Sequence, residues 1–196
     1  MANKQALRDL QSRLAQRLLA VRTDLPGTSW LAVEAGGHGF LLPLKEAGEI
    51  FSLAPILPVP HCRDWFSGVA NLRGHLHGVV DLARFLGLPT APNAPVAARV
   101  AGQLVGFNAA FDLNCVLRVD RLAGLRSDAQ MSPAAPAAEL TGTELTGAEF
   151  TGTALTAVNT RPAFAGVRLC DASGRVWQEL RLAALAVDAA FLSISA

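Results

Sequence analysis

The residues best suited to chemistry are the histidine pair His75 and His77, and Cys62, which directly follows His61. Residues two apart on a strand point the same way, so both imidazoles of the pair could meet one metal ion. Two ligands are too few for a zinc site, which usually takes three or four. Cys62 as a nucleophile would need a nearby base and a depressed pKa. We therefore expect no metal and no cofactor, with a small cysteine- or metal-dependent enzyme as an alternative.

Other catalytic signatures are missing from the sequence. It contains no G-x-S-x-G, no H-E-x-x-H, no G-x-x-x-x-G-K-[ST] and no C-x-x-C. Asp81 and Asp120 stand near the expected ends of elements, where structural roles account for them. We expect a protein without enzymatic activity.

The composition is that of a folded domain with a large core. The chain has 196 residues, of which 51% are hydrophobic and 17% are charged. Its formal net charge of +1 lacks the basic excess of a nucleic-acid binder. The three cysteines are far apart, which favours a reduced cytosolic protein. The apolar runs are too short to cross a bilayer, and the N-terminus lacks the apolar region of a signal peptide, so we expect a cytoplasmic location.

The N-terminal residues 1–26 predict an amphipathic helix. Over residues 4–22 apolar residues recur at helical spacing, and the D-L-P-G sequence at 24–27 ends the pattern. This helix either packs on the main domain or binds a partner or a second copy. The residues of its apolar stripe are Leu7, Leu10, Leu14 and Leu18.

The rest of the chain predicts mainly strands, in closed or partly closed antiparallel sheets. A hairpin is expected over 29–44, with the turn in the glycines at 36–39. The three prolines of residues 54–60 favour an edge or connector. Further pairs of strands are expected over 68–80, 96–119 and 166–180, and a short terminal helix over 181–191.

Two local patterns are more detailed. Asp81 is placed to N-cap a short helix over Leu82–Leu86, with Gly87 just past its end. In the later strand pair, one face at period two carries Leu113, Cys115, Leu117 and Val119.

Residues 139–156 form a near repeat of period five, ELTGT-ELTGA-EFTGT. Together with the Ala- and Pro-rich residues before it, this segment predicts a low-complexity loop insertion over 131–160. A fragment of a β-solenoid is the alternative, although such a stack needs several coils to bury a core.

The stretch W-F-S-G-V-A-N-L-R-G, followed by G-V-V-D-L, resembles the signature of CheW-like coupling domains. The matching residues are an aromatic residue, a Gly-Val pair, an Asn-Leu-Arg-Gly turn, a hydrophobic strand and an Asp-Leu pair. Weaker agreement extends over 28–196, and the end of the chain resembles the pilus-associated, PilI-like subgroup of twitching-motility systems. The residues that carry the signature are Trp65, Gly68, Val69, Asn71, Leu72, Arg73, Gly74, Val79, Val80, Asp81 and Leu82.

The resemblance implies a mainly β, CheW-like fold of two packed five-stranded SH3-like barrels. It implies a non-catalytic adaptor that binds the regulatory domain of a CheA-type histidine kinase and the cytoplasmic tip of a methyl-accepting receptor, and so is recruited to receptor arrays at the membrane. A coupling protein of flagellar-type chemotaxis is the alternative. Neither nucleic acid nor direct membrane insertion is expected.

The residues themselves support a binding surface at residues 71–74. Gly74 permits a tight turn, and Asn71 can bond the local backbone. Arg73 then projects where its planar fork of donors could reach a partner, although an internal salt bridge that braces the turn is also open. Trp65, Gly68 and Asp81 are expected to support the motif. The expected contact residues are Val69, Asn71, Leu72, Arg73, Gly74, Leu76 and Val79.

Overall fold

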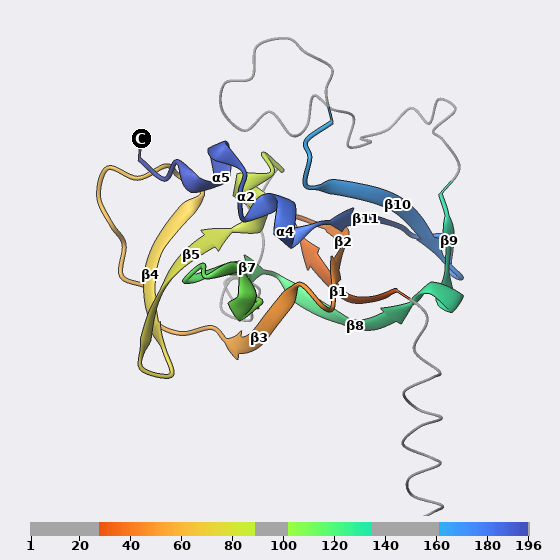
Figure 1. The fold of residues 1–196 in the computed structure, drawn as a ribbon, viewed down its shortest axis with the longest axis horizontal. Coiled ribbons are helices and arrows are strands. Elements are labelled where there is room, and N and C mark those ends of the chain that lie inside the picture. The colour runs from red at the N-terminus through yellow and green to blue at the C-terminus, as the bar shows by residue number, and fades with distance from the viewer. Residues whose placement is uncertain (1–27, 89–101, 135–160, 196) are drawn as a thin grey trace, which may run out of the picture.

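The computed structural model describes residues 28–88, 102–134 and 161–195. The predicted N-terminal helix at 1–26 and the repeat at 139–156 lie outside these residues. Within them, the mainly β architecture is confirmed: two curled sheets pack against each other, with short helices beside them (Figure 1).

The middle of the chain builds a five-stranded sheet. Its spatial order is β3-β6-β7-β5-β4, so β3 and β4 form its two edges. The strands are β3 (Ala47–Ser52), β4 (Phe66–Leu72), β5 (His75–Asp81), β6 (Gln103–Phe107) and β7 (Cys115–Val119).

The two ends of the described chain build a six-stranded sheet in the order β8-β1-β2-β11-β10-β9. The strands of this sheet precede and follow those of the five-stranded sheet in the sequence. The chain therefore cannot be divided at one point into two separate sheets. The strands are β1 (Ser29–Ala35), β2 (His38–Pro43), β8 (Arg121–Ser127), β9 (Met131–Pro133), β10 (Ala165–Asp171) and β11 (Val176–Leu180).

The sheets differ from the sequence prediction in two details. Five strands were expected in each, and the three-residue β9 adds a sixth at one edge by pairing with β10. The segment expected to be a loop from residue 131 therefore begins with a strand. Purely antiparallel pairing was also wrong, because β5 pairs with β7 and β2 with β11 in parallel. Parallel partners need a long crossover, and here other strands supply it.

The first hairpin forms as its glycines predict. Ala35 pairs with His38, and the two residues between them, Gly36 and Gly37, have φ of 56° and 81°. Two consecutive positive φ angles are those of a type I′ turn, which matches the natural twist of paired strands.

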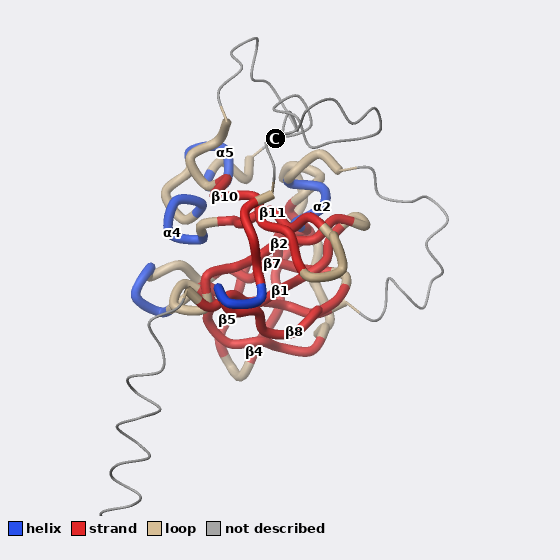
Figure 2. The backbone as a smooth tube through the Cα atoms, turned by 90° about the vertical axis from the view of Figure 1, so that its right-hand side faces the viewer, coloured by secondary structure: helices blue, strands red, loops and turns tan. Residues whose placement is uncertain are grey.

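The short α-helices of the described residues gather on one side of the strands (Figure 2). Helix α2 (Leu82–Phe85) begins as predicted, because the Arg84 N–H donates to Oδ1 of Asp81 at 3.1 Å. Gly87, with φ of 67°, ends it: the N–H groups of Gly87 and Leu88 donate to the carbonyls of Arg84 and Ala83.

The single terminal helix expected over 181–191 is two helices, α4 (Leu182–Leu185) and α5 (Ala189–Leu192). Asp188 causes the break. Its Oδ1 accepts the N–H groups of Ala190 and Phe191, both at 3.0 Å, and so starts a new helix.

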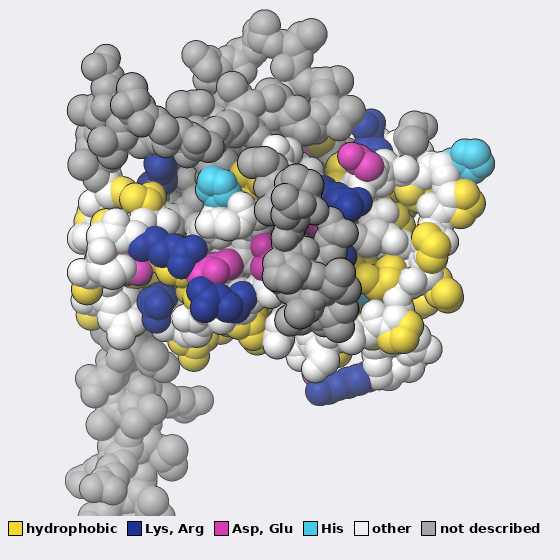
Figure 3. All heavy atoms as spheres, turned by 180° about the vertical axis from the view of Figure 1, so that it is seen from behind, with side chains coloured by type: hydrophobic (Ala, Val, Ile, Leu, Met, Phe, Trp, Pro, Cys, Tyr) yellow, Lys and Arg dark blue, Asp and Glu magenta, His cyan; other side chains and the backbone are white. Residues whose placement is uncertain are grey.

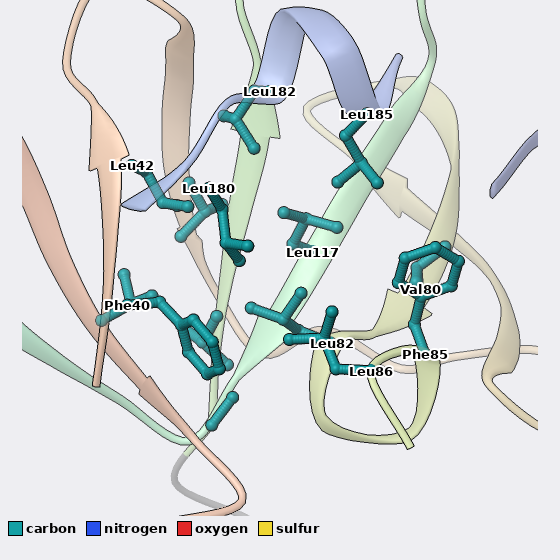
Figure 4. Close-up of a cluster of buried hydrophobic side chains, with 14 of the residues drawn as sticks. Phe40, Leu42, Val80, Leu82, Phe85, Leu86, Leu117, Leu180, Leu182 and Leu185 are labelled. Atoms are coloured by element: carbon teal, nitrogen blue, oxygen red, sulfur yellow. The ribbon is translucent and has the colours of Figure 1, made fainter. Parts of the chain in front are cut away.

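The buried side chains of the described residues form three hydrophobic clusters, one between the two sheets and one within each sheet. The largest lies between them, where side chains of β2, β5, β7, β11, α2 and α4 point toward one another (Figure 4). The predicted face of β7 contributes Cys115, Leu117 and Val119 to it. The five-stranded sheet has its own inner cluster, made by Ala70, Leu72, Val79, Leu104 and Val116. The six-stranded sheet has another, made by Trp30, Ala32, Leu41, Leu169 and Trp177.

Candidate partner-binding site

The Asn-Leu-Arg-Gly motif forms the tip of a two-stranded hairpin, β4–β5, called here the β4–β5 ribbon (residues 66–81). Leu72 pairs with His75, so Arg73 and Gly74 are the two turn residues. Their φ angles of 50° and 88° are those of a type I′ turn. Oδ1 of Asn71 accepts the N–H of Gly74 at 2.9 Å, as the sequence predicts. A left-handed conformation is unfavourable for Arg73, so its contacts with neighbouring residues matter for holding the turn.

Arg73 is braced within the chain while remaining accessible. Its Nη1 lies 2.9 Å from Oε1 and 2.8 Å from Oε2 of Glu49 on β3. The guanidinium also lies over the ring of Phe51, 5.6 Å from its centroid. Because the side chains of Arg73 and Glu49 are 70% and 58% exposed, water screens their attraction and it contributes less than about 1 kcal/mol. The internal bracing therefore exists, and the guanidinium is still open to a partner.

The two faces of the ribbon differ. The inner face carries Leu72 and Val79, which are 5% and 0% exposed and pack in the inner cluster of the five-stranded sheet. The expectation that these two side chains contact a partner was therefore wrong: the twofold alternation of the strands turns them into the core. The outer face carries Leu76, 61% exposed, together with the half-buried Val69 and the exposed Asn71.

A residue that sequence reasoning missed extends this outer face. Leu57, in the Pro-rich segment before β4, forms an isolated bridge with Val69 through two backbone hydrogen bonds of 2.8 Å. Paired residues share a face, and the Leu57 side chain is 67% exposed. A leucine among the prolines of this segment was the only sequence signal for it. Figure 3 shows hydrophobic side chains gathered along the edge of the molecule that carries β4 and this segment.

Gly68 allows this attachment. Its φ is 130°, and a Cβ at this position would lie 2.1 Å from the carbonyl oxygen of Leu57. No side chain fits there without displacing the Leu57 segment. The signature glycine is thus explained by close approach of two backbones.

The base of the ribbon is held by aromatic packing and by the cap of α2. Trp65 is 3% exposed and contacts Phe85 edge to face, with ring centroids 5.2 Å apart, and Phe191 in a stacked arrangement. Its carbonyl accepts the N–H of Asp81 at 2.9 Å. Trp65 and Asp81 therefore both lie at the base of the ribbon, beside α2.

A hollow of about 460 Å³ opens beside the turn. His75 and His77 both line it, as expected for residues two apart on a strand, together with Phe51 and Cys115. Burial raises the pKa of the Cys115 thiol to about 12, so it is not a ready nucleophile. Among the described residues, no three or more His, Cys, Asp or Glu side chains are grouped to hold a metal ion.

Two carboxylates with shifted pKa values lie on the six-stranded sheet, away from the ribbon. Burial raises the pKa of Glu34, but hydrogen bonds from Arg121 and Arg175 outweigh this and hold the value below normal. The pKa of Asp171 is held well below its ordinary value by hydrogen bonds from the Ser173 hydroxyl and the Trp177 indole N–H. These contacts explain both shifts as parts of the fold.

In the described part of the chain, no helix has the length and apolar character that crossing a membrane requires.

Comparison with known proteins identifies relatives. A family model described as the CheW-like domain matches residues 29–152. Protein PilI of Pseudomonas aeruginosa is 35% identical over 80 residues, which cover 41% of this chain and 45% of PilI. Chemotaxis protein CheW of Rhizobium meliloti is 31% identical over 84 residues, covering 41% of this chain and 54% of that protein. The matched regions thus span about half of each relative.

A solved structure shares the fold. The scaffolding protein TtCheW of Thermoanaerobacter tengcongensis superposes with a TM-score of 0.51 at 12% sequence identity, over 79% of this chain and 88% of TtCheW. The family match covers more than half of the chain and includes the whole β4–β5 ribbon. The chain therefore belongs to the CheW-like domain family.

Proposed function

We propose that this protein is a non-catalytic adaptor that couples a methyl-accepting chemoreceptor to a CheA-type histidine kinase. The pathway we propose is the chemosensory system of twitching motility and type IV pili. The similarity to PilI and the pilus-type end of the sequence support this choice. The protein would act in the cytoplasm and be recruited to receptor arrays, without nucleic acid and without inserting into the membrane.

One observation supports this proposal most directly: an exposed apolar surface on a rigid ribbon. Leu57 and Leu76 are 67% and 61% exposed. The half-buried Val69 lies between them on β4, which pairs with β5 on one side and with the segment of Leu57 on the other. The opposite face of the same ribbon is fixed in the core. A partner that covers these side chains gains apolar burial without having to order the ribbon first, which favours binding.

The test is the affinity for the kinase regulatory domain, measured by titration calorimetry. Leu76→Asp places a charge in the proposed contact, and we expect its affinity to fall about tenfold or more. Leu125→Asp is the matched control, because Leu125 on β8 is 60% exposed and lies in the other sheet. Equal affinities of the two variants would rule out the ribbon as the kinase-binding surface.

Two variants separate the roles of Arg73. We propose that its guanidinium contacts a partner carboxylate or helix-end carbonyl, so Arg73→Ala should weaken binding by about 1–2 kcal/mol while circular dichroism stays unchanged. Glu49→Gln removes the internal ion pair but keeps the arginine. Unchanged affinity in Glu49→Gln supports the direct contact, whereas an equal loss in both variants would mean that Arg73 only braces the turn.

A coupling protein of flagellar-type chemotaxis is the second candidate, and the similarity to the Rhizobium meliloti CheW protein favours it. Binding to isolated receptor tips of the two systems discriminates between the candidates. We expect tighter binding to the pilus-type receptor, and a clear preference for the flagellar-type receptor would replace our choice.

A further inference from the structure

The segment between β3 and β4, called here the connector (residues 53–65), carries part of the exposed apolar surface but belongs to no strand or helix. Its exposed leucine and valine, Leu57 and Val59, are 67% and 40% exposed. At one point the connector is fixed to β4 through the bridge between Leu57 and Val69. At the other it pairs with the C-terminal segment, where Cys62 forms a bridge with Ser195.

Arg63 makes this second attachment with both its backbone and its side chain. Its N–H donates to the carbonyl of Ile194 at 2.9 Å, and its Nε donates to the carbonyl of Ser193, also at 2.9 Å. A charged donor to a carbonyl makes a stronger bond than a neutral pair of groups. The two contacts from one residue fix both the distance and the orientation of the paired segments.

The C-terminal segment is itself anchored in the core. Phe191 is 2% exposed and stacks on Trp65, with ring centroids 6.3 Å apart. The residues after it expose apolar side chains again: Leu192 is 50% and Ile194 is 37% exposed. Trp65 thus anchors the end of the connector, and Arg63 is the residue whose side chain links the irregular part before it to the C-terminal segment.

We propose that Arg63 is a positioning residue that clamps the connector to the C-terminal segment and thereby fixes Leu57 for partner binding. This inference rests on the proposed function, because Leu57 belongs to the exposed apolar surface, with Val69 and Leu76, that we propose binds the kinase. Without the side-chain bond, the connector keeps the Leu57 bridge but moves more freely around it. A partner must then order the segment on binding, which lowers its affinity.

Hydrogen exchange and calorimetry on the full chain test the clamp. In Arg63→Ala, we expect the amides of residues 61–63 and 193–195 to exchange at least about fivefold faster, while those of β5 and β7 stay unchanged. The affinity for the kinase regulatory domain should fall about fivefold. Arg63→Lys, which can still donate to one carbonyl, should recover part of both effects. Arg126→Ala on β8 is the control, because it removes the same charge from the other sheet.

Hydrogen exchange tests whether Arg63 clamps the connector, and the affinity tests whether the clamp positions Leu57. Unchanged exchange in Arg63→Ala would overturn the clamp, and faster exchange with unchanged affinity would overturn its role in positioning Leu57. If the unaltered protein binds neither the kinase domain nor the receptor tip, the proposed function fails, and the exchange data alone still decide whether Arg63 clamps the connector.

Discussion

Replacing Gly68 with alanine should displace the connector from β4. It should therefore lower the free energy of unfolding by more than the backbone strain at this position alone. The added Cβ would lie 2.1 Å from the Leu57 carbonyl oxygen, so the connector must move away. This motion breaks both 2.8 Å hydrogen bonds between Leu57 and Val69, which together contribute about 2 kcal/mol. An alanine held at φ of 130° adds about 1–2 kcal/mol. We therefore expect the free energy of unfolding to fall by about 3–4 kcal/mol.

Urea denaturation followed by tryptophan fluorescence measures this loss, and Gly124→Ala is its matched control. Gly124 has φ of 94° in edge strand β8, and nothing lies within 4 Å of where its Cβ would stand. The control should lose only the strain, about 1–2 kcal/mol. Equal losses in the two variants would refute the argument that close approach of the connector requires Gly68.

Three further predictions concern the core and its titrating groups. Val79→Ala leaves a cavity at a fully buried site and should lower the free energy of unfolding by about 2 kcal/mol in urea denaturation. The affinity of the folded protein for the kinase domain should not change. A loss of affinity would mean that Val79 contacts the partner after all. Because hydrogen bonds from Ser173 and Trp177 hold the folded pKa of Asp171 below the unfolded value of about 3.9, its stabilisation is present above about pH 4 and lost as pH falls further. Thermal melts of Asp171→Asn should therefore show a weaker decline in acid than the unaltered protein, and parallel declines would contradict this assignment. With the pKa of Cys115 at about 12, a thiol reagent near pH 8 should label the partly exposed Cys62 and Cys170 in the native protein but reach Cys115 only after unfolding, as mass spectrometry can determine.

The elements that the sequence predicted well have strong local signals. The two hairpin turns require positive φ angles, and the sequence places glycine at three of the four positions, with Arg73 as the exception. Asp81 and Gly87 bound α2 for similarly local reasons. Local backbone chemistry of this kind is readable without knowing the rest of the fold.

The strands that the sequence did not predict lie at sheet edges. β3 and β8 are only partly buried, and each contains a glycine, so neither shows the clear alternation of a half-buried strand. Their positions depend on partners far away in the chain: Ile50 pairs with Val105, and Leu31 pairs with Leu125. In β3 and β8, pairing with distant strands therefore outweighs the weak preference of the local sequence for a strand.

The candidate site was predicted only in part, for the same reason. The motif located the hairpin, but a motif that fits a strand does not say which of its two faces meets the core. Leu72 and Val79 turned inward, and Leu76 stayed outside. Leu57 and Glu49 entered the site through contacts between residues 12 and 24 positions apart. Tertiary contacts such as these determine which residues share a surface.

The most direct test of the proposed binding surface is hydrogen exchange of this chain, alone and saturated with the kinase regulatory domain. We expect protection on binding to concentrate in the connector around Leu57 and in the β4–β5 ribbon from Val69 to Leu76. Protection confined to β8, β10 and β11 of the six-stranded sheet, with the ribbon exchanging as in the free protein, would contradict it.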